Sequence, residues 1–239
     1  MSSLKNVTAM ILVGGLGTRL RSVVTDRPKP LALVHERPFL DYLLYQLIEA
    51  GIEDVVLCIG YLGEKVVETY GNSFLSLKIR YSQEEIQLGT AGALRRALPL
   101  IKSEFVLVMN GDSFCDINLQ DFWQWYCSRK SFVSIVLTEV DNTKRYGQVQ
   151  TDSSGLIKLF KEKGDTEELG WINAGIYLIT RELLTSIPLE RMVSLEKDIF
   201  PIWINLEIYG YQTKNRFIDI GTPETYKQAE LVLNELSEI

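Results

Sequence analysis

The stretch that decides the fold of this chain reads Leu12-Val13-Gly14-Gly15-Leu16-Gly17-Thr18-Arg19-Leu20, and Pro28-Lys29-Pro30-Leu31 follows it. Three glycines within four positions let the backbone adopt positive φ and bring its N–H groups against phosphate oxygens. Arg19 and Lys29 add two positive charges to the same segment. The alternative is a turn that only connects a strand to a helix, but such a turn does not need two cations. The stretch therefore predicts a loop that binds a triphosphate.

Two common phosphate motifs do not match this loop. A P-loop needs G-x-x-x-x-G-K-[ST], but Arg19 stands five residues after Gly14, and no Lys-Ser or Lys-Thr follows. The dinucleotide motif G-x-G-x-x-G fails because Leu20 stands in place of its third glycine. A Walker ATPase and an NAD enzyme are therefore disfavoured.

The composition allows one large α/β domain and argues against several classes of protein. The 239 residues, of which 46% are hydrophobic and 23% charged, can bury a full core. A net charge of -6, with dispersed cations, argues against binding of nucleic acid. No apolar segment reaches eighteen residues, and the N-terminal residues contain no apolar signal region. We therefore expect a cytoplasmic protein that makes no contact with a membrane.

The cysteines and the single histidine predict no disulfide, zinc site or catalytic triad. Cys58, Cys115 and Cys127 show no C-x-x-C spacing, and we expect all of them to be buried as small hydrophobic side chains. His35 has no nucleophile signature beside it, so we expect it at the surface or in a turn.

Apolar runs alternate with amphipathic stretches along the chain, which is typical of repeated βα units and a largely parallel sheet. In the first part, strands are expected at 7–13, 54–60, 78–82 and 105–109, and helices at 39–50, 63–70, 90–98 and 119–127. In the second part, strands are expected at 131–140, 147–151, 156–160 and 171–179, with a hairpin turn at 152–155. Two further helices are expected, over 195–205 with an interruption at Pro201, and over 222–236 with a capped start. The second part thus adds antiparallel strands to the sheet.

Two aspartates are candidate metal ligands. Asp112, in Asn110-Gly111-Asp112, follows the strand expected at 105–109, and open α/β sheets bind ligands at the carboxyl ends of their strands. Asp219 stands between apolar residues just before the helix that Thr222 caps. Two hard oxygen ligands suit Mg²⁺, whose shell phosphate oxygens and water would complete. An ordinary turn at Asp112 and a helix-capping role for Asp219 are the alternatives.

Two polar groups stand out in the second part of the chain. Lys161-Glu162-Lys163-Gly164 follows a strand-like run, where charged side chains are usually solvated. Asn173 lies inside the apolar run Trp171-Ile172-Asn173-Ala174-Gly175. An amide is costly to bury there unless it meets a polar partner such as a sugar hydroxyl.

Together, these motifs and their order resemble the sugar-1-phosphate nucleotidyltransferases over almost the whole chain. The family motifs G-G-x-G-T-R-L, P-K-P-[LM], N-G-D, E-K, I-N-x-G and I-D-x-G-x-P are matched by the segments 14–20, 28–31, 110–112, 162–163, 172–175 and 218–223. The resemblance implies a Rossmann-like, three-layer α/β fold of the GT-A-like nucleotidyltransferase type, with a mixed, mainly parallel central sheet. It implies one domain over 1–239, with a nucleotide-binding half at about 1–118 and a sugar-binding half at about 119–239.

Within that family, Leu88-Gly89-Thr90-Ala91-Gly92-Ala93-Leu94 is similar to the guanylyltransferases that act on mannose-type sugars. Glu84 and Glu85 precede this turn, and a carboxylate is the natural partner of guanine, which presents two neighbouring N–H donors. Solvated loop charges are the alternative for both glutamates. One departure is Gln87, where guanylyl relatives commonly have proline. The short length and the segments 194–198 and 217–226 resemble the D-glycero-α-D-manno-heptose 1-phosphate guanylyltransferases of bacterial surface polysaccharide pathways.

The resemblance implies that a sugar 1-phosphate oxygen attacks the α-phosphorus of GTP in line with the departing pyrophosphate. It assigns Arg19 to the β- and γ-phosphates, Lys29 to the α-phosphate and Lys163 to the sugar phosphate, with Mg²⁺ on Asp112 and Asp219. The expected nucleotide-binding residues are Leu12, Gly14, Gly15, Gly17, Thr18, Arg19, Lys29, Glu84, Glu85, Gly89, Thr90 and Asp112. The expected sugar-binding residues are Gly111, Gly147, Glu162, Lys163 and Asn173.

Other activities stay open on the sequence alone. Within the enzyme class, these are mannose-1-phosphate guanylyl transfer and transfer from CTP or UTP to another hexose 1-phosphate. Outside it, the alternative is a non-catalytic regulatory subunit that binds a nucleotide sugar. Such modules tend to lose the metal aspartates or the loop cations, whereas this chain keeps Arg19, Lys29, Asp112 and Asp219. Assembly into a homo-oligomer is also left open.

Overall fold

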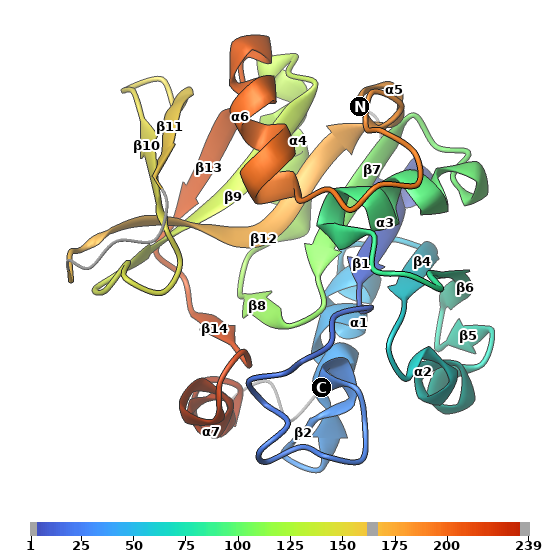
Figure 1. Ribbon diagram of the computed structural model, residues 1–239. Helices are drawn as coiled ribbons and strands as arrows, with labels where there is room; N and C mark the ends of the chain where they lie inside the picture. The colour runs from blue at the N-terminus through green and yellow to red at the C-terminus, as the bar shows by residue number, and fades with distance from the viewer. Residues whose placement is uncertain (1–3, 162–166, 235–239) are drawn as a thin grey trace.

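An eight-stranded mixed sheet forms the centre of the computed structural model, which describes residues 4–161 and 167–234 (Figure 1). The strand order is β13-β9-β12-β7-β1-β4-β6-β5. The strands are β1 (Thr8–Leu12), β4 (Asp54–Ile59), β5 (Ser73–Phe74), β6 (Leu77–Gln83), β7 (Phe105–Asn110), β9 (Val133–Val140), β12 (Gly170–Thr180) and β13 (Tyr209–Thr213). The run β7-β1-β4-β6 is parallel and β13 is parallel to β9, whereas β12 is antiparallel to β7 and β9. The expected mixed, mainly parallel sheet is confirmed.

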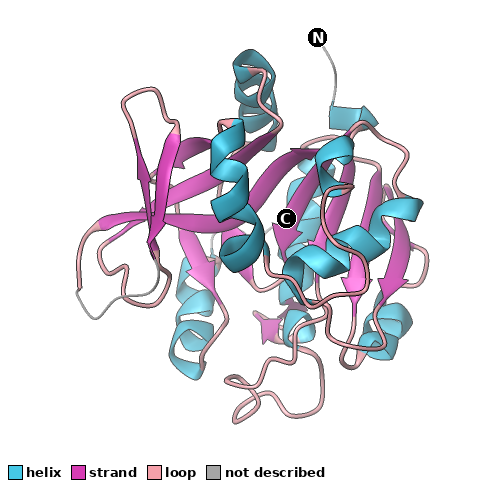
Figure 2. Ribbon diagram, turned by 45° about the horizontal axis from the view of Figure 1, so that its top comes forward, coloured by secondary structure: helices cyan, strands magenta, loops and turns pink. Residues whose placement is uncertain are grey.

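Helices cover both faces of this sheet (Figure 2). They are α1 (Phe39–Glu49), α2 (Gly63–Tyr70), α3 (Gly89–Ala97), α4 (Leu119–Arg129), α5 (Arg181–Leu184), α6 (Phe200–Trp203) and α7 (Pro223–Val232). Ala9 and Ile11 of β1 belong to the core cluster that α1, α2 and α4 complete. Met10, which points to the opposite face, belongs to the cluster of α3 and α6. Because β1 is buried on both faces, its residues after Thr8 form a continuous apolar run. The three-layer fold is confirmed.

In the part of the chain that the structure describes, three short two-stranded pairings lie outside the central sheet. They are β2 (Leu33–Val34) with β3 (Arg37–Pro38), β8 (Ser113–Cys115) with β14 (Phe217–Asp219), and β10 (Gln148–Thr151) with β11 (Ile157–Lys161). Figure 1 shows β10 and β11 standing away from the sheet on the side of β13. The pairing of β14 with β8 brings the chain before α7 back to the end of β7.

Several predicted elements differ from the structure in detail. The helix expected over 195–205 is divided into a π-helical turn at Leu195–Ile199, the helix α6, and a 3₁₀ turn at Ile204–Leu206. Pro201 lies in the first turn of α6, where its missing N–H is tolerated, but it cannot continue a helix from before. The predicted cap of the last helix is confirmed, since Thr222 accepts a hydrogen bond from Thr225 N.

The prediction for the cysteines is wrong at one position. Cys58 and Cys115 are buried, but Cys127 of α4 is exposed. The buried face of α4 is filled by Phe122, Trp123 and Tyr126, and Cys127 lies beyond it. His35 is exposed, as expected, and its Nε2 lies 2.6 Å from the carbonyl oxygen of Glu230. None of the helices in the described residues has the length and apolar character to cross a membrane.

Candidate active site

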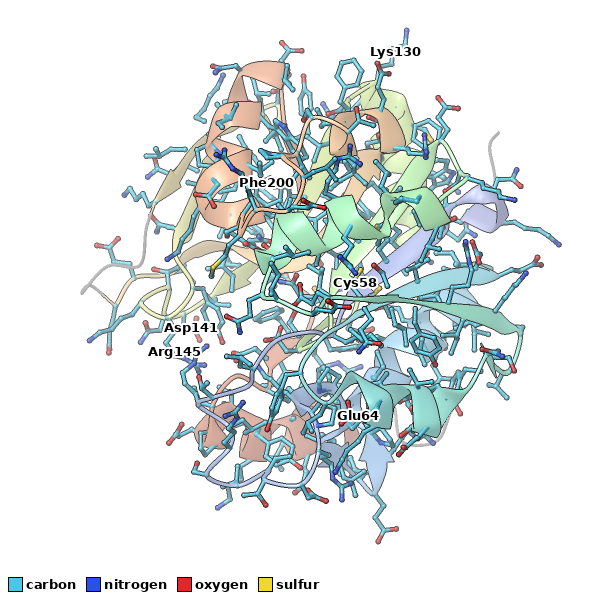
Figure 3. The ribbon with its side chains drawn as sticks, turned by 45° about the vertical axis from the view of Figure 1, so that its right-hand side comes forward. Cys58, Glu64, Lys130, Asp141, Arg145 and Phe200 are labelled. Carbon is cyan, nitrogen blue, oxygen red and sulfur yellow. The ribbon has the colours of Figure 1, made fainter. Side chains whose placement is uncertain are left out.

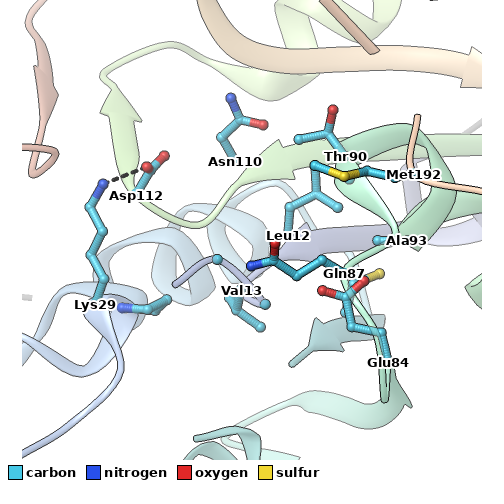
Figure 4. A pocket seen from close by; sticks show the side chains of 15 residues that line it. Leu12, Val13, Lys29, Glu84, Gln87, Thr90, Ala93, Asn110, Asp112 and Met192 are labelled. Atoms are coloured by element: carbon cyan, nitrogen blue, oxygen red, sulfur yellow. Dashed lines mark hydrogen bonds and ion pairs between the residues drawn. The ribbon is translucent and has the colours of Figure 1, made fainter. Parts of the chain in front are cut away.

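Two adjoining cavities open at the carboxyl ends of the central parallel strands. The first has a volume of about 340 Å³ and is lined by the ends of β1, β4 and β7, the loop after β6, and the start of α3 (Figure 4). The second has a volume of about 370 Å³ and lies between the end of β7, the hairpin of β10 and β11, and the segment around Asp219. Asn110 and Asp112 line both cavities. These two residues therefore mark the junction at which two ligands would meet.

The three glycines of the loop after β1 serve three different purposes. Gly17 has a φ of +59°, and a Cβ built on it would lie 3.3 Å from Lys29 Cβ. Gly14 packs closely, because a Cβ there would lie 3.0 Å from Glu84 Oε1 and 3.2 Å from Gly60 N. Gly15 faces open space at the wall of the first cavity. The missing side chain at Gly15 leaves room for a ligand against the backbone.

Two cations and two carboxylates converge beside this loop. Lys29 Nζ lies 2.6 Å from Asp112 Oδ2, and the Lys29 side chain is only 11% exposed (Figure 4). A Cβ built on Gly221 would lie 2.5 Å from Asp219 Oδ1, 3.5 Å from Arg19 Nη2 and 3.6 Å from Lys29 Nζ. The side chains expected to bind phosphate and metal are thus brought together around Gly221.

Asp219 accepts hydrogen bonds from several directions. The backbone N–H of Gly221 donates to Oδ1 at 2.7 Å, and Thr225 Oγ1 donates to the same atom at 3.4 Å. Arg145 Nη2 lies 3.2 Å from Oδ1, and the Tyr146 hydroxyl donates to Oδ2. Burial and then the hydrogen bond to Asp219 raise the pKa of Tyr146, so its hydroxyl remains a donor at neutral pH.

The donor set fits a divalent cation. Asp219 is opposite Ser113 in the pairing of β14 with β8, and Ile220 N donates to the carbonyl oxygen of Asp112 at 2.9 Å. Both carboxylates line the second cavity, and hard carboxylate oxygens are ligands that Mg²⁺ prefers. Within residues 4–161 and 167–234, no group of three or more His, Cys, Asp or Glu gathers as a metal cluster. A metal held by two carboxylates needs phosphate oxygens and water for its other positions.

The structure separates the two candidate glutamates. Glu84 is half-buried, lines the first cavity, and accepts a hydrogen bond from Leu88 N at 3.2 Å. Burial raises the pKa of the Glu84 carboxyl, while the Leu88 N–H and Arg96 lower it. Glu85 is exposed and is not part of either cavity wall. Glu84 is therefore the one that can meet a ligand.

Gly89 fixes the turn that forms the wall beside Glu84. Its φ is +70°, and a Cβ on it would lie 2.5 Å from the carbonyl oxygen of Val193. We expect Gly89→Ala to lower the free energy of unfolding by about 3 kcal/mol or more, through backbone strain and a clash with backbone. Gly51→Ala is the matched control, because Gly51 has a φ of +75° but only an ordinary contact, with Gln120 Nε2 at 3.9 Å.

Urea unfolding of both variants measures how much each substitution lowers the free energy of unfolding. The control is expected to lose about 1–2 kcal/mol, which is the strain of positive φ alone. Equal losses in the two variants would mean that the contact between Gly89 and Val193 does not constrain the turn.

The expected sugar-binding residues are placed unequally. Asn173 and Gly147 line the second cavity. The Asn173 amide donates to the Tyr177 hydroxyl at 2.9 Å and accepts from Gly175 N at 2.8 Å, so its burial does not by itself require a sugar. The backbone N–H of Gly111 donates to the carbonyl oxygen of Leu12 at 2.9 Å, and Gly111 lines neither cavity. Glu162 and Lys163 lie outside the described residues.

The other residues that were expected to bind the nucleotide do not all line the same cavity. Leu12, Gly14, Gly15, Lys29, Gly89 and Thr90 line the first cavity, whereas Arg19 lines the second. Thr18 is exposed and lines neither cavity. Gly17 also lines neither cavity, and its missing side chain leaves room for the Lys29 side chain.

Sequence reasoning missed several side chains of the site, and four of them matter most for its chemistry. They are Asn110, Arg145, Tyr146 and Glu196, all of which line the second cavity. Glu196 accepts hydrogen bonds from Thr90 Oγ1 at 3.0 Å and from the Tyr177 hydroxyl at 3.4 Å, and so joins the two cavities. The buried Asn110 Oδ1 has no hydrogen-bond partner in the described chain, which leaves an acceptor for a ligand at the junction. Arg145 stands directly before Tyr146-Gly147, and this position was the one signal in the sequence that could have identified it as a site residue.

Comparisons with known proteins match most of the chain. The family described as nucleotidyl transferase matches residues 8–235 of the chain. The D-glycero-alpha-D-manno-heptose 1-phosphate guanylyltransferase of Campylobacter jejuni is 37% identical over 218 residues, which are 91% of this chain and 96% of that protein. The protein of the same name from Aneurinibacillus thermoaerophilus is 37% identical over 223 residues, covering 93% and 96%.

More distant relatives and solved structures extend the comparison. The mannose-1-phosphate guanylyltransferase of Mycobacterium tuberculosis is 34% identical over 224 residues, covering 92% of this chain but 62% of that longer protein. The crystal structure of HddC from Yersinia pseudotuberculosis complexed with GMP-PN is similar with a TM-score of 0.84 and 32% identity. That match covers 94% of this chain and 98% of the other.

Proposed function

Because the chain belongs to the nucleotidyl transferase family, we propose that it transfers GMP from GTP to D-glycero-α-D-manno-heptose 1-phosphate and releases pyrophosphate. The observation that carries the proposal is the pair of cavities that meet at Asn110 and Asp112, with Lys29 and Arg19 beside the junction. Relatives whose names state this activity match over 96% of their length. We also propose a cytoplasmic enzyme whose product, a GDP-heptose, supplies surface polysaccharide synthesis.

The two cavities divide the substrates between them. GTP would lie in the first, with guanine near Glu84 and its phosphates along Gly14 and Gly15 toward Lys29. The sugar 1-phosphate would lie in the second, beside Gly147 and Asn173. In that arrangement the attacking oxygen and the α-phosphorus meet at the junction, and no covalent intermediate with the enzyme is needed.

Charge is the main obstacle to this reaction. Two anions must approach each other, and a pair of unit charges 4 Å apart costs about 4 kcal/mol at an effective dielectric near 20. Lys29 and Arg19 offset that repulsion, and Lys29 does so from a fixed position because it is largely buried. Asp112 and Asp219 would hold Mg²⁺, which supplies further positive charge at the phosphate oxygens.

The proposed contact between Glu84 and guanine can be tested by measuring the KM for GTP at different pH values. A carboxylate can accept both N–H donors of guanine, whereas a glutamine amide or a protonated carboxyl presents a donor of its own. Because burial raises the pKa of Glu84, its carboxylate is lost at a higher pH than that of an exposed glutamate. We expect the KM for GTP to rise as the pH falls through this raised pKa.

In Glu84→Gln, the KM for GTP is expected to be about ten- to hundredfold higher and insensitive to pH over the same range. Glu85→Gln is the matched control, since Glu85 is exposed on the same loop, and it should behave as wild type. A Glu84→Gln enzyme that keeps the wild-type KM and pH profile would remove Glu84 from the base site.

The nucleotide itself is tested by product formation. The enzyme is supplied with Mg²⁺, heptose 1-phosphate and one of GTP, ATP, CTP or UTP, and the nucleotide sugar is identified by mass spectrometry. We expect GDP-heptose to form with a kcat/KM at least about tenfold above that for any other nucleotide, as one charge-assisted contact implies. Equal use of UTP or CTP would contradict guanylyl transfer.

A further inference from the structure

Arg145 and Tyr146 both line the second cavity and both bind the candidate metal ligand Asp219, and Arg145 is the one of the two that carries a charge. Its Nη2 lies 3.2 Å from Asp219 Oδ1 and 3.4 Å from Oδ2. Arg145 lies in the loop between β9 and β10, and Figure 3 labels its side chain. The Asp219 side chain is 13% exposed and that of Arg145 is 37% exposed. The ion pair therefore closes the solvent side of the carboxylate.

A metal ion and the Arg145 guanidinium compete for this carboxylate. Oδ1 is already oriented by Gly221 N at 2.7 Å and by Thr225 Oγ1 at 3.4 Å, and both donors are uncharged. A divalent cation on Asp219 would stand next to the guanidinium, and the two positive charges repel each other. We expect these donors to keep Asp219 in its orientation without Arg145, so that the exchange of one cation for the other does not require the carboxylate to move.

The two ion pairs of the site differ in how easily they separate. Lys29, on Asp112, is 11% exposed, and its stem passes Gly17. Arg145 is more than three times as exposed and lies in a loop without helix or strand at residues 141–147. Of the two cations, Arg145 is therefore the one that we expect to leave its carboxylate.

The second cavity offers Arg145 a suitable destination. Arg19, Lys161 and Lys197 line the same cavity, so a guanidinium that leaves Asp219 and stays in this cavity lies among other cations. A planar guanidinium binds phosphate through two parallel N–H···O contacts. On the proposed function, the phosphate that enters this cavity belongs to the sugar 1-phosphate.

We propose that Arg145 holds Asp219 in the metal-free enzyme and transfers to the phosphate of the sugar 1-phosphate when the metal binds Asp219. The inference rests on the proposed function. On this proposal, Arg145 weakens metal binding and strengthens binding of the acceptor. Loss of Arg145 removes a competitor of the metal and a ligand of the acceptor.

The test measures Mn²⁺ binding in the absence of nucleotide and sugar, by the electron paramagnetic resonance signal of free Mn²⁺. Arg145→Gln is expected to bind Mn²⁺ about tenfold more tightly than wild type, because one competing charge is gone. The KM for the sugar 1-phosphate, measured with the loaded enzyme, is expected to rise about tenfold or more while the KM for GTP stays within about twofold. Arg145→Lys keeps a competing charge but not the planar fork, so its Mn²⁺ affinity should stay near that of wild type.

Two further variants make the outcome decisive. Lys144→Gln removes an exposed charge from the same loop and should leave both measurements at their wild-type values. Asp219→Asn should abolish the tighter Mn²⁺ binding when it is combined with Arg145→Gln. If it does not, Asp219 is not the metal ligand and the metal site of the proposed function fails. If Arg145→Gln binds Mn²⁺ no more tightly than wild type, or not measurably, the exchange is wrong while the proposed function stands.

Discussion

Asp112→Asn is expected to lower kcat at least about a hundredfold, since a loss of several kcal/mol of transition-state stabilisation costs about tenfold per 1.4 kcal/mol. Asp112 lines both cavities and is paired with Lys29 at 2.6 Å. Asparagine keeps the shape of the side chain but removes the charge that would hold a divalent cation and balance Lys29. The change therefore acts where the two substrates meet.

Pyrophosphate release at saturating Mg²⁺ and substrates measures the loss. Asp116→Asn is the matched control, because Asp116 belongs to the same region but pairs with Arg216 at 2.9 Å and lines neither cavity. A half-exposed ion pair of this kind is worth about 0–1 kcal/mol, so the control should keep near wild-type activity. Retention of more than about a tenth of the activity by Asp112→Asn would exclude Asp112 as a required metal ligand.

Lys29→Met is expected to lower kcat/KM for GTP by about 10²–10³, which is the usual cost of removing one preorganised electrostatic group. Methionine keeps most of the length of the side chain and the part of it that passes Gly17, so the main loss is the charge. Because Asp112 is 46% exposed, water can solvate the carboxylate that Lys29 leaves. We therefore expect a large effect on activity and a small one on stability.

Steady-state kinetics and a thermal melt separate these two effects. Arg27→Met is the matched control, since Arg27 stands two residues away, is paired with Asp26 at 2.8 Å, and lines neither of the two cavities. Its activity should stay close to that of wild type. A Lys29→Met enzyme within about tenfold of wild type would show that Lys29 does not stabilise the transferring phosphate.

Local sequence patterns were sufficient for the long elements of the fold. The helix expected at 63–70 has these same bounds in the structure, and the capped start at Thr222 is present. The strands β8, β13 and β14 were not predicted. They have three to five residues each, and their register comes from pairing with segments far away in the chain. No local pattern encodes such a pairing.

The candidate site was also predictable only where its residues lie in local motifs. The glycine loop, Lys29 and Asp112 were recognisable because they lie in short, ordered motifs. That Glu84 and not Glu85 faces the first cavity depends on the direction in which the loop after β6 turns, which the sequence does not specify. Arg145 was missed because its position depends on the loop after β9 folding back onto Asp219. The roles of Glu162 and Lys163 stay predictions, since these residues lie outside the described chain.

The acceptor is the most direct test of the account. Pyrophosphate release should be measured with Mg²⁺ and GTP, with D-glycero-α-D-manno-heptose 1-phosphate and α-mannose 1-phosphate compared at equal concentration. We predict a preference for the heptose of at least about tenfold in kcat/KM. Equal or better use of mannose 1-phosphate would contradict the heptose assignment and make the chain a mannose-1-phosphate guanylyltransferase, whereas no release with either sugar would contradict guanylyl transfer itself.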